Sequence, residues 1–522
     1  MRSRVIPVRE DGWNLADRRP ARYPRTKIVC TLGPATDSRD IIRRMVIAGM
    51  SVARVNFAHG EHAAHARIVR LVRRVSSALG RKIALLGDLP GPKIRLGKFR
   101  LEPTTLYGGQ LFQLTVNKVL GDSRIASVTE KSLPKHVRRG STIFLADGTV
   151  RLRVIKNDGE ILTCRVLDGG RVSSGKGVNV PDLAGDFPSV TKEDKTHLDF
   201  ALRNDFDIVA VSFVRTARDI ECVRGLVQGK RRNLMIMAKI EKRQAMSNLD
   251  SIIEVSDGVM VARGDLGVEM GLERVPILQD GIIRECNEKG KPVVTATQML
   301  LSMIQSPTPT RAEVSDIADA VQDGTDAVML SEETAIGRFP VEAVRVMARV
   351  AAIAEQTLSY ADILASRRPS AQRKIGDAIS LAACEIALKL GCSAIVAPTR
   401  SGTTARRVSR YRPPLPIVAL TADEKVANQL AISWGVIPYM IDRMKDHIEL
   451  FEEAEKATVK MGLTGKGDRI VIVGGDLASP YGTTNLLKVH TVLERDKDLQ
   501  DYALVKRSSI RRKATWTPRY ST

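Results

Sequence analysis

The sequence predicts an α/β fold in which a (β/α)8 barrel carries an inserted small β-barrel domain and is followed by an open α/β domain. Eight short apolar runs rich in β-branched residues each end in a polar or glycine-containing loop and precede an amphipathic stretch. Strands that alternate with helices form parallel sheets, and eight such units close into a TIM barrel. The eight runs are Lys27–Cys30, Ser51–Val55, Ile83–Leu86, Asp207–Ser212, Leu234–Ile240, Gly258–Ala262, Pro292–Thr295 and Asp326–Leu330.

Two of the intervening segments carry clear helix signals. Ser38–Ala48 has an acidic, serine-containing start before apolar residues at helical spacing. Val341–Thr357 follows Pro340 and presents a face of Ala, Val and Met. Both segments are therefore expected to be helices that pack against the barrel.

The pattern changes in the long gap between the third and fourth runs. Apolar residues alternate there as in antiparallel strands, and Asn157-Asp158-Gly159 is a hairpin-turn signal. The gap therefore predicts a small β-domain inserted after the third barrel strand. Its expected strands are Leu111–Val116, Thr142–Leu145, Val150–Ile155 and Ile161–Val166.

Strand and helix alternation resumes after a linker near Ser366–Lys374, which predicts a second, smaller α/β domain. Its expected strands are Ala394–Pro398, Pro416–Leu420, Gly435–Met440, Arg469–Val473 and Leu487–Val492. The domains predicted are an N-terminal extension at 1–24, the barrel at 25–88 and 183–362, the inserted lid at 89–182, the C-terminal domain at 370–495 and a basic tail at 496–522.

Composition narrows the class of protein. Of the 522 residues, 43% are hydrophobic and 27% are charged, which is ordinary for a globular chain. No uncharged apolar run approaches the ~20 residues that span a bilayer, and Met1–Arg9 lacks the apolar segment of a secretory signal. The six cysteines form no C-x-x-C pair, so neither a zinc site nor a disulfide framework is expected. A cytoplasmic protein without a membrane partner fits these features.

The formal net charge of +22 allows two interpretations. It is compatible with nucleic-acid binding, and Val505–Thr522 contains six Lys or Arg and no acid. The alternative is an enzyme that handles several phosphates, or a host whose proteins are generally basic. A nucleic-acid partner is not the expectation, because the excess charge is spread along the chain.

The ends of the eight runs should carry the chemistry, because active sites of TIM barrels lie at the C-terminal ends of the strands. Cations, a few carboxylates and hydroxyls converge there. Carboxylates among cations favour a hard divalent metal, and the cations favour a phosphorylated substrate. The residues at these ends are Arg54, Asn56, Asp88, Lys93, Arg95, Ser212, Arg215, Lys239, Glu241, Arg263, Gly264, Asp265, Thr297, Gln298, Ser331, Glu332 and Glu333.

Several strings resemble those of pyruvate kinases, in order, from about Arg25 to Val492. They are Thr26–Pro34 (TKIVCTLGP), Ala53–Gly60 (ARVNFAHG), Lys239–Glu241 (KIE), Val261–Gly267 (VARGDLG), Ala296–Met299 (ATQM) and Pro309–Glu313 (PTRAE). The resemblance implies a phosphotransferase that moves the phosphoryl group of phosphoenolpyruvate to ADP, giving pyruvate and ATP in the last step of glycolysis.

The resemblance also implies roles at the rim. Glu241 and Asp265 would bind catalytic Mg²⁺, with Mn²⁺ a possible substitute. Lys239 and Arg54 would hold the moving phosphoryl group. The turn that begins at Gly264 and Asp265 suits the substrate carboxylate. Water ordered by Thr297, with Ser331 as a further member of the relay, would protonate the enolate left behind.

The nucleotide is expected between the barrel rim and the lid. Arg54, Asn56, His59, Arg95 and Lys176 resemble the nucleotide-side residues of the family. Asp147 would reach the site as the lid closes and excludes water.

One departure from the family pattern predicts that K⁺ is not required. Asn56 and Asp88 of the usual K⁺ site are kept, but Ala58 replaces a Ser and Leu89-Pro90 replaces Thr-Lys. Lys93 stands where potassium-dependent members have a Glu. Its ammonium group could supply the charge of the monovalent cation, which would leave a vestigial site.

The loop Thr399, Arg400, Ser401, Gly402, Thr403 and Thr404 resembles the pocket in which family members bind the phosphate of an allosteric effector. The alternative is a well-capped helix start without a ligand. Members of the family are usually homotetramers, and this assembly is the expectation here.

Two other functions stay open on the sequence. One is a different barrel enzyme acting on pyruvate or its enolate, such as a metal-dependent aldolase, although such an enzyme has no use for the lid and Lys176. The other is a catalytically silent or RNA-associated pyruvate kinase relative that uses the basic tail.

Overall fold

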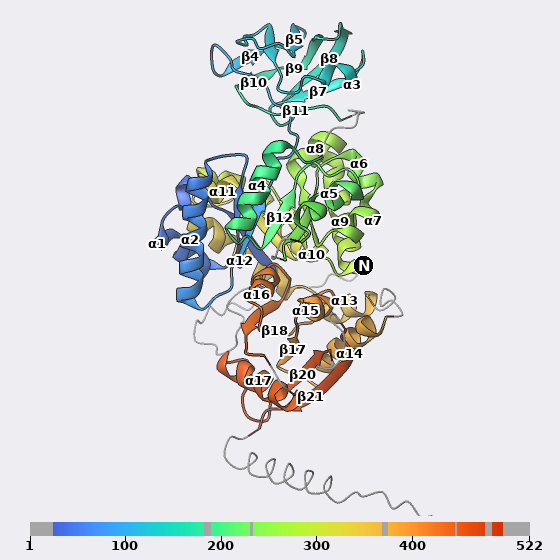
Figure 1. The fold of residues 1–522 in the computed structure, drawn as a ribbon. Coiled ribbons are helices and arrows are strands. Elements are labelled where there is room, and N and C mark those ends of the chain that lie inside the picture. Colours follow the sequence, from blue (N-terminus) through green and yellow to red (C-terminus); the bar gives the residue numbers. More distant parts are fainter. Residues whose placement is uncertain are drawn as a thin grey trace, which may run out of the picture.

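The fold comes from a computed structural model, and the structure describes residues 24–181, 189–229, 233–367, 374–443, 446–475 and 483–493. Three bodies are stacked along one axis, with a barrel between a β-rich lid and a C-terminal α/β domain (Figure 1). The predicted N-terminal extension and basic tail lie outside the described residues, as does most of the expected linker.

The central body is a closed barrel of eight strands in the order β1-β16-β15-β14-β13-β12-β3-β2, and every neighbouring pair is parallel. The predicted TIM barrel is therefore confirmed. The strands are β1 Lys27–Thr31, β2 Met50–Asn56, β3 Ala84–Asp88, β12 Ile208–Val211, β13 Met235–Ile240, β14 Gly258–Ala262, β15 Val293–Ala296 and β16 Ala327–Leu330.

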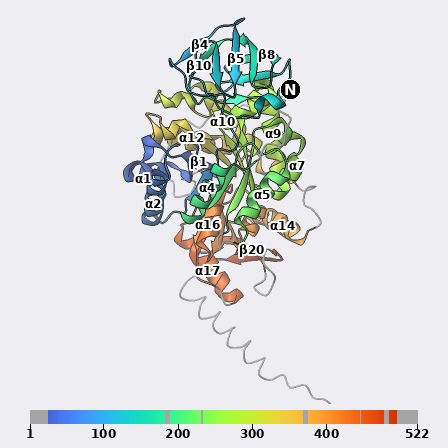
Figure 2. The ribbon, with the colours of Figure 1, turned by 45° about the horizontal axis from the view of Figure 1, so that its top comes forward.

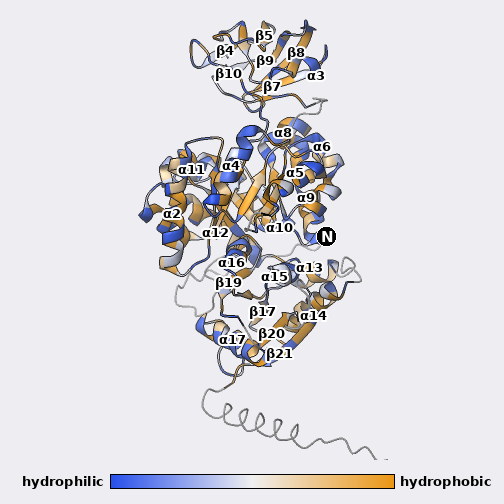
Figure 3. Ribbon diagram, in the orientation of Figure 1, coloured by the Kyte–Doolittle hydropathy of each residue, from blue (hydrophilic) through white to orange (hydrophobic). Residues whose placement is uncertain are grey.

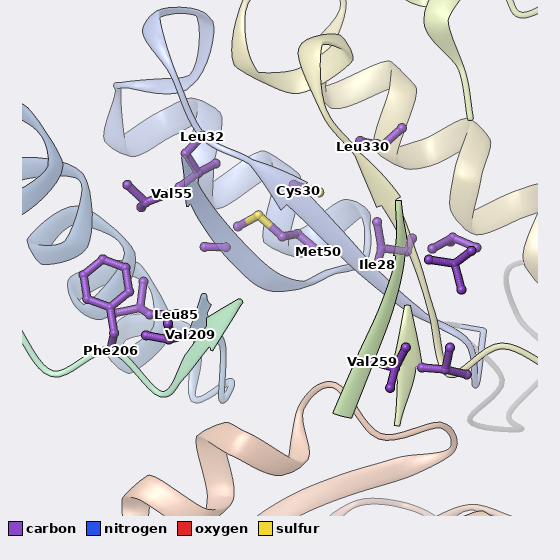
Figure 4. Packing of buried hydrophobic residues seen from close by; sticks show 14 of the residues in the cluster. Ile28, Cys30, Leu32, Met50, Val55, Leu85, Phe206, Val209, Val259 and Leu330 are labelled. Atoms are coloured by element: carbon purple, nitrogen blue, oxygen red, sulfur yellow. The ribbon is translucent and has the colours of Figure 1, made fainter. Parts of the chain in front are cut away.

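Two apolar layers hold the barrel, because successive side chains of a strand point to opposite faces. Val29 belongs to the cluster inside the barrel, whereas Ile28 and Cys30 belong to the cluster between strands and helices. Figure 4 shows members of the outer cluster at close range, and Figure 3 shows the barrel strands as the most hydrophobic part of this body. Ala431 and Ile432 of the C-terminal domain complete the inner cluster.

The helices begin and end where local signals place them. Helix α1 (Arg39–Ala48) is capped by Ser38, whose Oγ accepts from the Ile41 amide, and ends at Gly49. Helix α12 (Pro340–Gln356) starts with its proline at the first position. The other helices around the barrel are α2 His62–Leu79, α4 Lys192–Arg203, α5 Ala217–Val227, α6 Arg243–Ser247, α7 Leu249–Val255, α8 Arg263–Met270, α9 Val275–Lys289, α10 Arg311–Asp323, α11 Glu332–Ala335 and α13 Tyr360–Ser366, with short 3₁₀ turns at Pro34–Thr36, Leu272–Arg274 and Leu301–Ile304.

The lid follows β3 and has a hydrophobic core of its own. Its strands form a six-stranded sheet, β11-β7-β8-β9-β5-β6, and a two-stranded sheet, β10-β4. The hairpin expected at Asn157-Asp158-Gly159 joins antiparallel β8 and β9, and Gly159 has a φ of 96°. The lid elements are β4 Thr104–Leu106, β5 Leu111–Thr115, β6 Ile125–Ser127, α3 Leu133–His136, β7 Thr142–Leu145, β8 Val150–Asn157, β9 Ile161–Asp168, β10 Gly170–Val172 and β11 Val178–Asn179.

The C-terminal domain is an open five-stranded sheet in the order β19-β18-β17-β20-β21. Four of its strands are parallel, and the edge strand β21 runs antiparallel to β20. The elements are α14 Ile375–Lys389, β17 Ala394–Pro398, α15 Thr403–Ser409, β18 Ile417–Thr421, α16 Glu424–Leu430, β19 Val436–Met440, α17 His447–Lys460, β20 Arg469–Gly474 and β21 Leu486–Thr491.

The lid and the C-terminal domain lie at opposite ends of the barrel in both views (Figures 1 and 2). The C-terminal domain contacts the N-terminal ends of the strands: the Gly435 amide donates to the Arg25 carbonyl, and Lys27 Nζ donates to the Val436 carbonyl at 2.8 Å. The C-terminal ends of the strands therefore face the lid. No helix in the described part of the chain is long and apolar enough to cross a membrane.

Candidate active site

A chain of buried charges joins the ends of neighbouring barrel strands. Lys239 Nζ lies 2.9 Å from Glu241 Oε1 and 3.2 Å from Asp88 Oδ1, and it donates to Ser212 Oγ at 2.7 Å. Arg54 Nε donates to Asp88 Oδ2 at 2.8 Å. Four strand ends therefore hold two cations and two carboxylates in fixed positions at the rim.

Neighbouring charges keep Asp88 and Lys239 ionised within this chain of buried groups. Burial opposes ionisation of Asp88, but the adjacent Lys239 and Arg54 lower the pKa of its carboxyl group. Burial likewise opposes the charge of Lys239, while Asp88 and Glu241 raise the pKa of its ammonium group. Lys239 thus keeps its positive charge at neutral pH without a bound substrate.

Glu241 and Asp265 have the character of a two-carboxylate cation site. Glu241 is 1% exposed and accepts from the Phe213 amide at 2.7 Å. Burial raises the pKa of its carboxyl group, Lys239 opposes this shift, and the charge of Asp265 adds to it. A divalent cation beside both carboxylates would relieve this repulsion, so the two residues fit Mg²⁺.

A metal at this rim would need oxygen ligands from elsewhere to complete its coordination. Within the described ranges, no cluster of three or more His, Cys, Asp or Glu side chains could hold a metal ion. Magnesium commonly keeps one or two protein carboxylates and takes its other ligands from water and substrate phosphates. In the present structure Lys93 Nζ donates to Asp265 Oδ1 at 3.3 Å.

Thr297 is held in a strained conformation after β15. Its φ is 71°, in the left-handed region that β-branched residues seldom adopt. Its Oγ1 donates to the Ala296 carbonyl at 2.6 Å and accepts from the Gly264 amide at 2.9 Å. The hydroxyl group is thereby fixed beside the first turn of α8, where Asp265 also lies.

Arg263 fastens this strained segment. Its guanidinium donates to the Thr297 carbonyl at 2.7 Å and forms a two-pronged pair with Asp316 of α10, at 2.5 and 2.7 Å. The sequence placed Arg263 at the rim but did not single out Asp316. The nearby PTRAE string marks the start of α10, but nothing in it indicates that a residue one turn further on reaches the rim.

Thr31 ends β1, and Ser331 directly follows the adjoining strand β16. Thr31 Oγ1 accepts from Arg54 Nη1 at 2.7 Å, and Thr31, at the end of the first barrel strand, was not among the predicted rim residues. The Ser331 amide donates to Glu333 Oε2 at 2.6 Å, and the Leu300 amide donates to Glu333 Oε1 at 3.1 Å. Glu333 therefore links the loops that follow the seventh and eighth barrel strands.

The expected nucleotide residues are only partly assembled. Burial lowers the pKa of the His59 imidazole, and the nearby charges of Arg95 and Arg54 lower it further. Arg95 Nη1 donates to the Gly175 carbonyl at 3.0 Å. Lys176 is exposed on the lid, and its side chain has no hydrogen bond or ion pair within the described residues. Asn56 Oδ1 accepts from the Ala58 amide at 3.1 Å.

Asp147 of the lid lies beside Lys93 at the rim. Asp147 has a φ of 56°, and its Oδ1 lies 4.0 Å from Lys93 Nζ. Lys93 thus stands between a lid carboxylate and Asp265. The Asp88 carboxylate is instead engaged by Arg54 and Lys239.

The hydroxyl groups of the loop 399–404 bond mostly to one another. Ser401 Oγ and Thr403 Oγ1 are 2.9 Å apart, and Thr399 Oγ1 accepts from the Gly402 amide at 2.9 Å. Thr404 Oγ1 pairs with Thr484 Oγ1 at 2.9 Å. Arg400 is exposed beside them.

A parallel barrel whose rim joins fixed cations to a pair of carboxylates has the arrangement of a barrel enzyme that acts on an anionic substrate. Family models described as "Pyruvate kinase, barrel domain" and "Pyruvate kinase, alpha/beta domain" match residues 23–344 and 377–490. The chain belongs to the pyruvate kinase family. It is a phosphotransferase that acts on phosphoenolpyruvate and ADP in glycolysis.

Individual relatives agree with this assignment. The chain is 43% identical to "Pyruvate kinase" of Clostridium acetobutylicum, over 90% of this chain and 99% of that one. It is 44% identical to "Pyruvate kinase" of Geobacillus stearothermophilus, over 90% of this chain and 80% of that one. The crystal structure of a pyruvate kinase from Cryptosporidium parvum superposes with a TM-score of 0.85 at 36% identity, covering 92% of this chain and 98% of that one.

Proposed function

We propose that Lys239 and Arg54 are the principal catalytic cations of pyruvate formation. The observation that carries this proposal is the fixed position of Lys239 Nζ between Glu241 and Asp88, at 2.9 and 3.2 Å. Phosphoryl transfer depends mainly on positioning and on neutralising charge as it develops. Two cations held by buried carboxylates need little reorganisation when the phosphoryl group moves.

Glu241 and Asp265 are proposed to hold Mg²⁺, or Mn²⁺ in its place. The metal would supply charge neutralisation at the oxygens of the substrate. The amides of the turn at Gly264 and Asp265 would hold the substrate carboxylate. Thr297 Oγ1, fixed at 2.9 Å from the Gly264 nitrogen, would orient the water that gives a proton to the enolate carbon, and Ser331 would extend the relay.

The nucleotide is proposed to bind between the rim and the lid at 89–182. Arg54, Asn56, His59, Arg95 and Lys176 would contact it. Lys176 is exposed on the lid beside Arg95, whose Nη1 donates to the Gly175 carbonyl at 3.0 Å, so both residues would contact the nucleotide from the lid side. Asp147 would move with the lid, and closure would exclude water, which otherwise hydrolyses the phosphoryl donor.

K⁺ is proposed to be dispensable. The family generally uses Mg²⁺ and K⁺, but Lys93 places an ammonium group 3.3 Å from Asp265 Oδ1. A fixed ammonium group supplies the single positive charge that a bound monovalent cation would bring. Asn56 and Asp88 would then remain from a K⁺ site that no longer binds K⁺.

The experiment measures pyruvate formation from phosphoenolpyruvate and ADP with Mg²⁺, in potassium chloride and in tetramethylammonium chloride. We expect comparable rates in the two salts for the wild type. The Lys93→Glu variant should be slow in tetramethylammonium and recover at least about tenfold in potassium, since its carboxylate restores a cation requirement. Strong potassium stimulation of the wild type would refute the independence from K⁺.

We also propose an allosteric effector site, a homotetrameric assembly and a cytoplasmic location, all of which are usual in the family. Thr399–Thr404 would hold the phosphate of an allosteric effector, supported by the hydroxyl groups gathered there. A homotetramer is supported by exposed apolar side chains on both large domains, such as Ile277 and Ile375, which are 76% and 71% exposed in the single chain. A cytoplasmic location suits a glycolytic enzyme with six unpaired cysteines.

A further inference from the structure

A small cavity lies between the N-terminal end of the barrel and the C-terminal domain, at the opposite end of the barrel from the rim. The barrel contributes Lys291 and Asp326 to its lining, and the C-terminal domain contributes Arg406, Arg410, Arg412 and Ser433. The lining therefore holds four cations and one carboxylate. None of these residues belongs to the phosphoryl-transfer site.

The carboxylates near the cavity balance only two of the four cations. Arg412 pairs with Asp326 at 2.9 Å, and Arg410 Nη1 lies 3.3 Å from Asp377 Oδ1. Both carboxylates are therefore already in ion pairs. Among the described residues, Lys291 and Arg406 have no carboxylate of their own: they share the charge of Asp257, which already pairs with Arg224 at 3.0 Å.

Lys291 and Arg406 donate their hydrogen bonds to neutral acceptors, and the charge of Asp257 acts on both without an ion-pair contact. Lys291 Nζ donates to the carbonyls of Glu254 and Ser256, at 3.0 and 2.6 Å, and Arg406 Nη2 donates to the Ser401 carbonyl at 2.9 Å. In the described part of the chain, neither side chain has a carboxylate within ion-pair distance. Both side chains are half-buried, and the Asp257 carboxylate that acts on them is already paired with Arg224, so the site favours an additional negative charge.

Several proton equilibria at the cavity are shifted. Burial lowers the pKa of both Lys291 and Arg406, and the charge of Asp257 acts in the opposite direction on both. Arg367, which donates to the Arg410 carbonyl, has its pKa lowered to about 9 by burial and then by the charge of Arg412. A fifth cation thus borders the same region.

Two buried donors at the cavity have no partner. Ser433 is 1% exposed and Arg412 is 3% exposed, yet neither Ser433 Oγ nor Arg412 Nε has a hydrogen-bond partner among the described residues. Buried polar groups are almost always satisfied, so an unsatisfied pair at one cavity indicates a missing small ligand that accepts hydrogen bonds.

The size of the cavity limits what that ligand can be. A water-sized group can be centred over only about 10 Å³ of it, which is about the space of one water molecule or one monatomic ion. A phosphate or a sugar phosphate needs several times this space. The donors, the surplus of cations over carboxylates and the size together suit a halide.

We propose that this cavity binds one chloride ion, which bridges Ser433 and the Arg412 guanidinium and balances Lys291 and Arg406. The ion contacts groups from both large domains, so it binds only when the domains are docked. Chloride therefore stabilises the joint between the barrel and the C-terminal domain.

Bromide provides a direct structural test. Crystals of the full chain grown or soaked in sodium bromide should show an anomalous peak in the cavity, within contact distance of Ser433 Oγ and Arg412 Nε. Density for a water molecule without an anomalous signal, or no density there, overturns the proposal.

Thermal unfolding in solution provides a second test. At fixed ionic strength, replacing gluconate by chloride should raise the unfolding midpoint of the wild type and then saturate, because a ligand that binds only the native state stabilises it. An equal response to both anions contradicts a specific site.

Matched variants locate the effect. Lys291→Met should weaken the chloride response at least about tenfold in concentration, whereas Lys289→Met should keep it, because Lys289 pairs with Asp250 at the surface. If Lys291→Met does not fold, Ser433→Ala removes one donor with little change in volume and should also weaken the response. A full chloride response in the foldable variant refutes the site.

Discussion

At the scale of single residues, each functional group of the rim is held in place by hydrogen bonds or ion pairs with its neighbours. Lys239 is fixed by two carboxylates and a serine hydroxyl group. Thr297 is fixed by the Gly264 amide and, through its carbonyl, by Arg263. The strained φ of Thr297 persists because these bonds over-determine it.

Arg263 should therefore act on catalysis through position. We expect Arg263→Lys to lower kcat by about 10²-fold with a small change in KM, because a single ammonium group cannot hold Asp316 with two bonds while bonding to the Thr297 carbonyl. Steady-state kinetics with phosphoenolpyruvate as the varied substrate would measure both constants. An unchanged kcat in a folded variant would show that Thr297 does not depend on this contact.

At the scale of elements, helices α2 and α4 meet through a cluster of aromatic rings and histidines. His62 Nε2 and His197 Nδ1 are 2.8 Å apart, and His197 stacks on Phe57 with ring centroids 5.1 Å apart. Both ring nitrogens of the buried His65 lack a hydrogen-bond partner among the described residues. The neighbouring acids are Glu61 beside α2 and Glu193 and Asp194 on α4.

This cluster should make folding sensitive to acid. Burial and then the charge of His62 lower the pKa of both His65 and His197. Below the ordinary histidine pKa of about 6.5, the unfolded chain therefore binds more protons than the folded chain. The stabilisation of the fold by neutral His65 and His197 is complete above that pH and is lost as the pH falls through their pKa values in the folded state. We expect the unfolding midpoint to hold from pH 8 to 7 and to drop towards pH 5.

Replacing one ring identifies the source of this acid sensitivity. His197→Phe keeps a ring stacked on Phe57 but cannot be protonated, so its midpoint should fall less steeply with acid than that of the wild type. His136→Gln, in the lid, serves as the matched control and should leave the slope unchanged. Parallel slopes for wild type and His197→Phe would exclude a contribution from His197.

The helices and strands were easier to predict from the sequence than the contacts between side chains. The eight barrel strands and the ends of α1 and α12 follow from apolar runs, from Ser38 and from Pro340, all of which are local signals. The direction of β21 was not predicted, because a single apolar run does not encode whether a strand is parallel. The partnership of Arg263 with Asp316 was not predicted either, since it joins two helices, α8 and α10, that are far apart in sequence.

At the scale of the whole molecule, the barrel separates two functional ends. The lid covers the rim, and the C-terminal domain closes the other end with Ala431 and Ile432 inside the barrel cluster. Arg412 fastens this joint: it bonds to both oxygens of Asp326, at 3.1 and 2.9 Å, and to Asn287 at 2.7 Å. Asp326 immediately precedes β16, which leads to Ser331 at the rim.

Breaking this buried pair should loosen the joint. We expect Arg412→Met to destabilise the docked domains by about 3–5 kcal/mol, because it leaves the Asp326 charge buried without a partner. Calorimetry should then resolve separate transitions of the barrel and the C-terminal domain. The double variant Asp326→Asn/Arg412→Met should recover part of the loss; a single variant as stable as the wild type would contradict the role of the pair.

The most direct test of the account compares the wild type with Lys239→Met in Mg²⁺-dependent formation of pyruvate from phosphoenolpyruvate and ADP. Lys242→Met is the matched control, since Lys242 lies nearby but pairs with Glu269 at 2.6 Å. We expect robust activity in the wild type and the control, and a loss of about 10³-fold or more in Lys239→Met, because the cation that neutralises the moving phosphoryl group is gone. A folded Lys239→Met variant that retains activity close to that of the wild type would contradict the central role assigned to this residue.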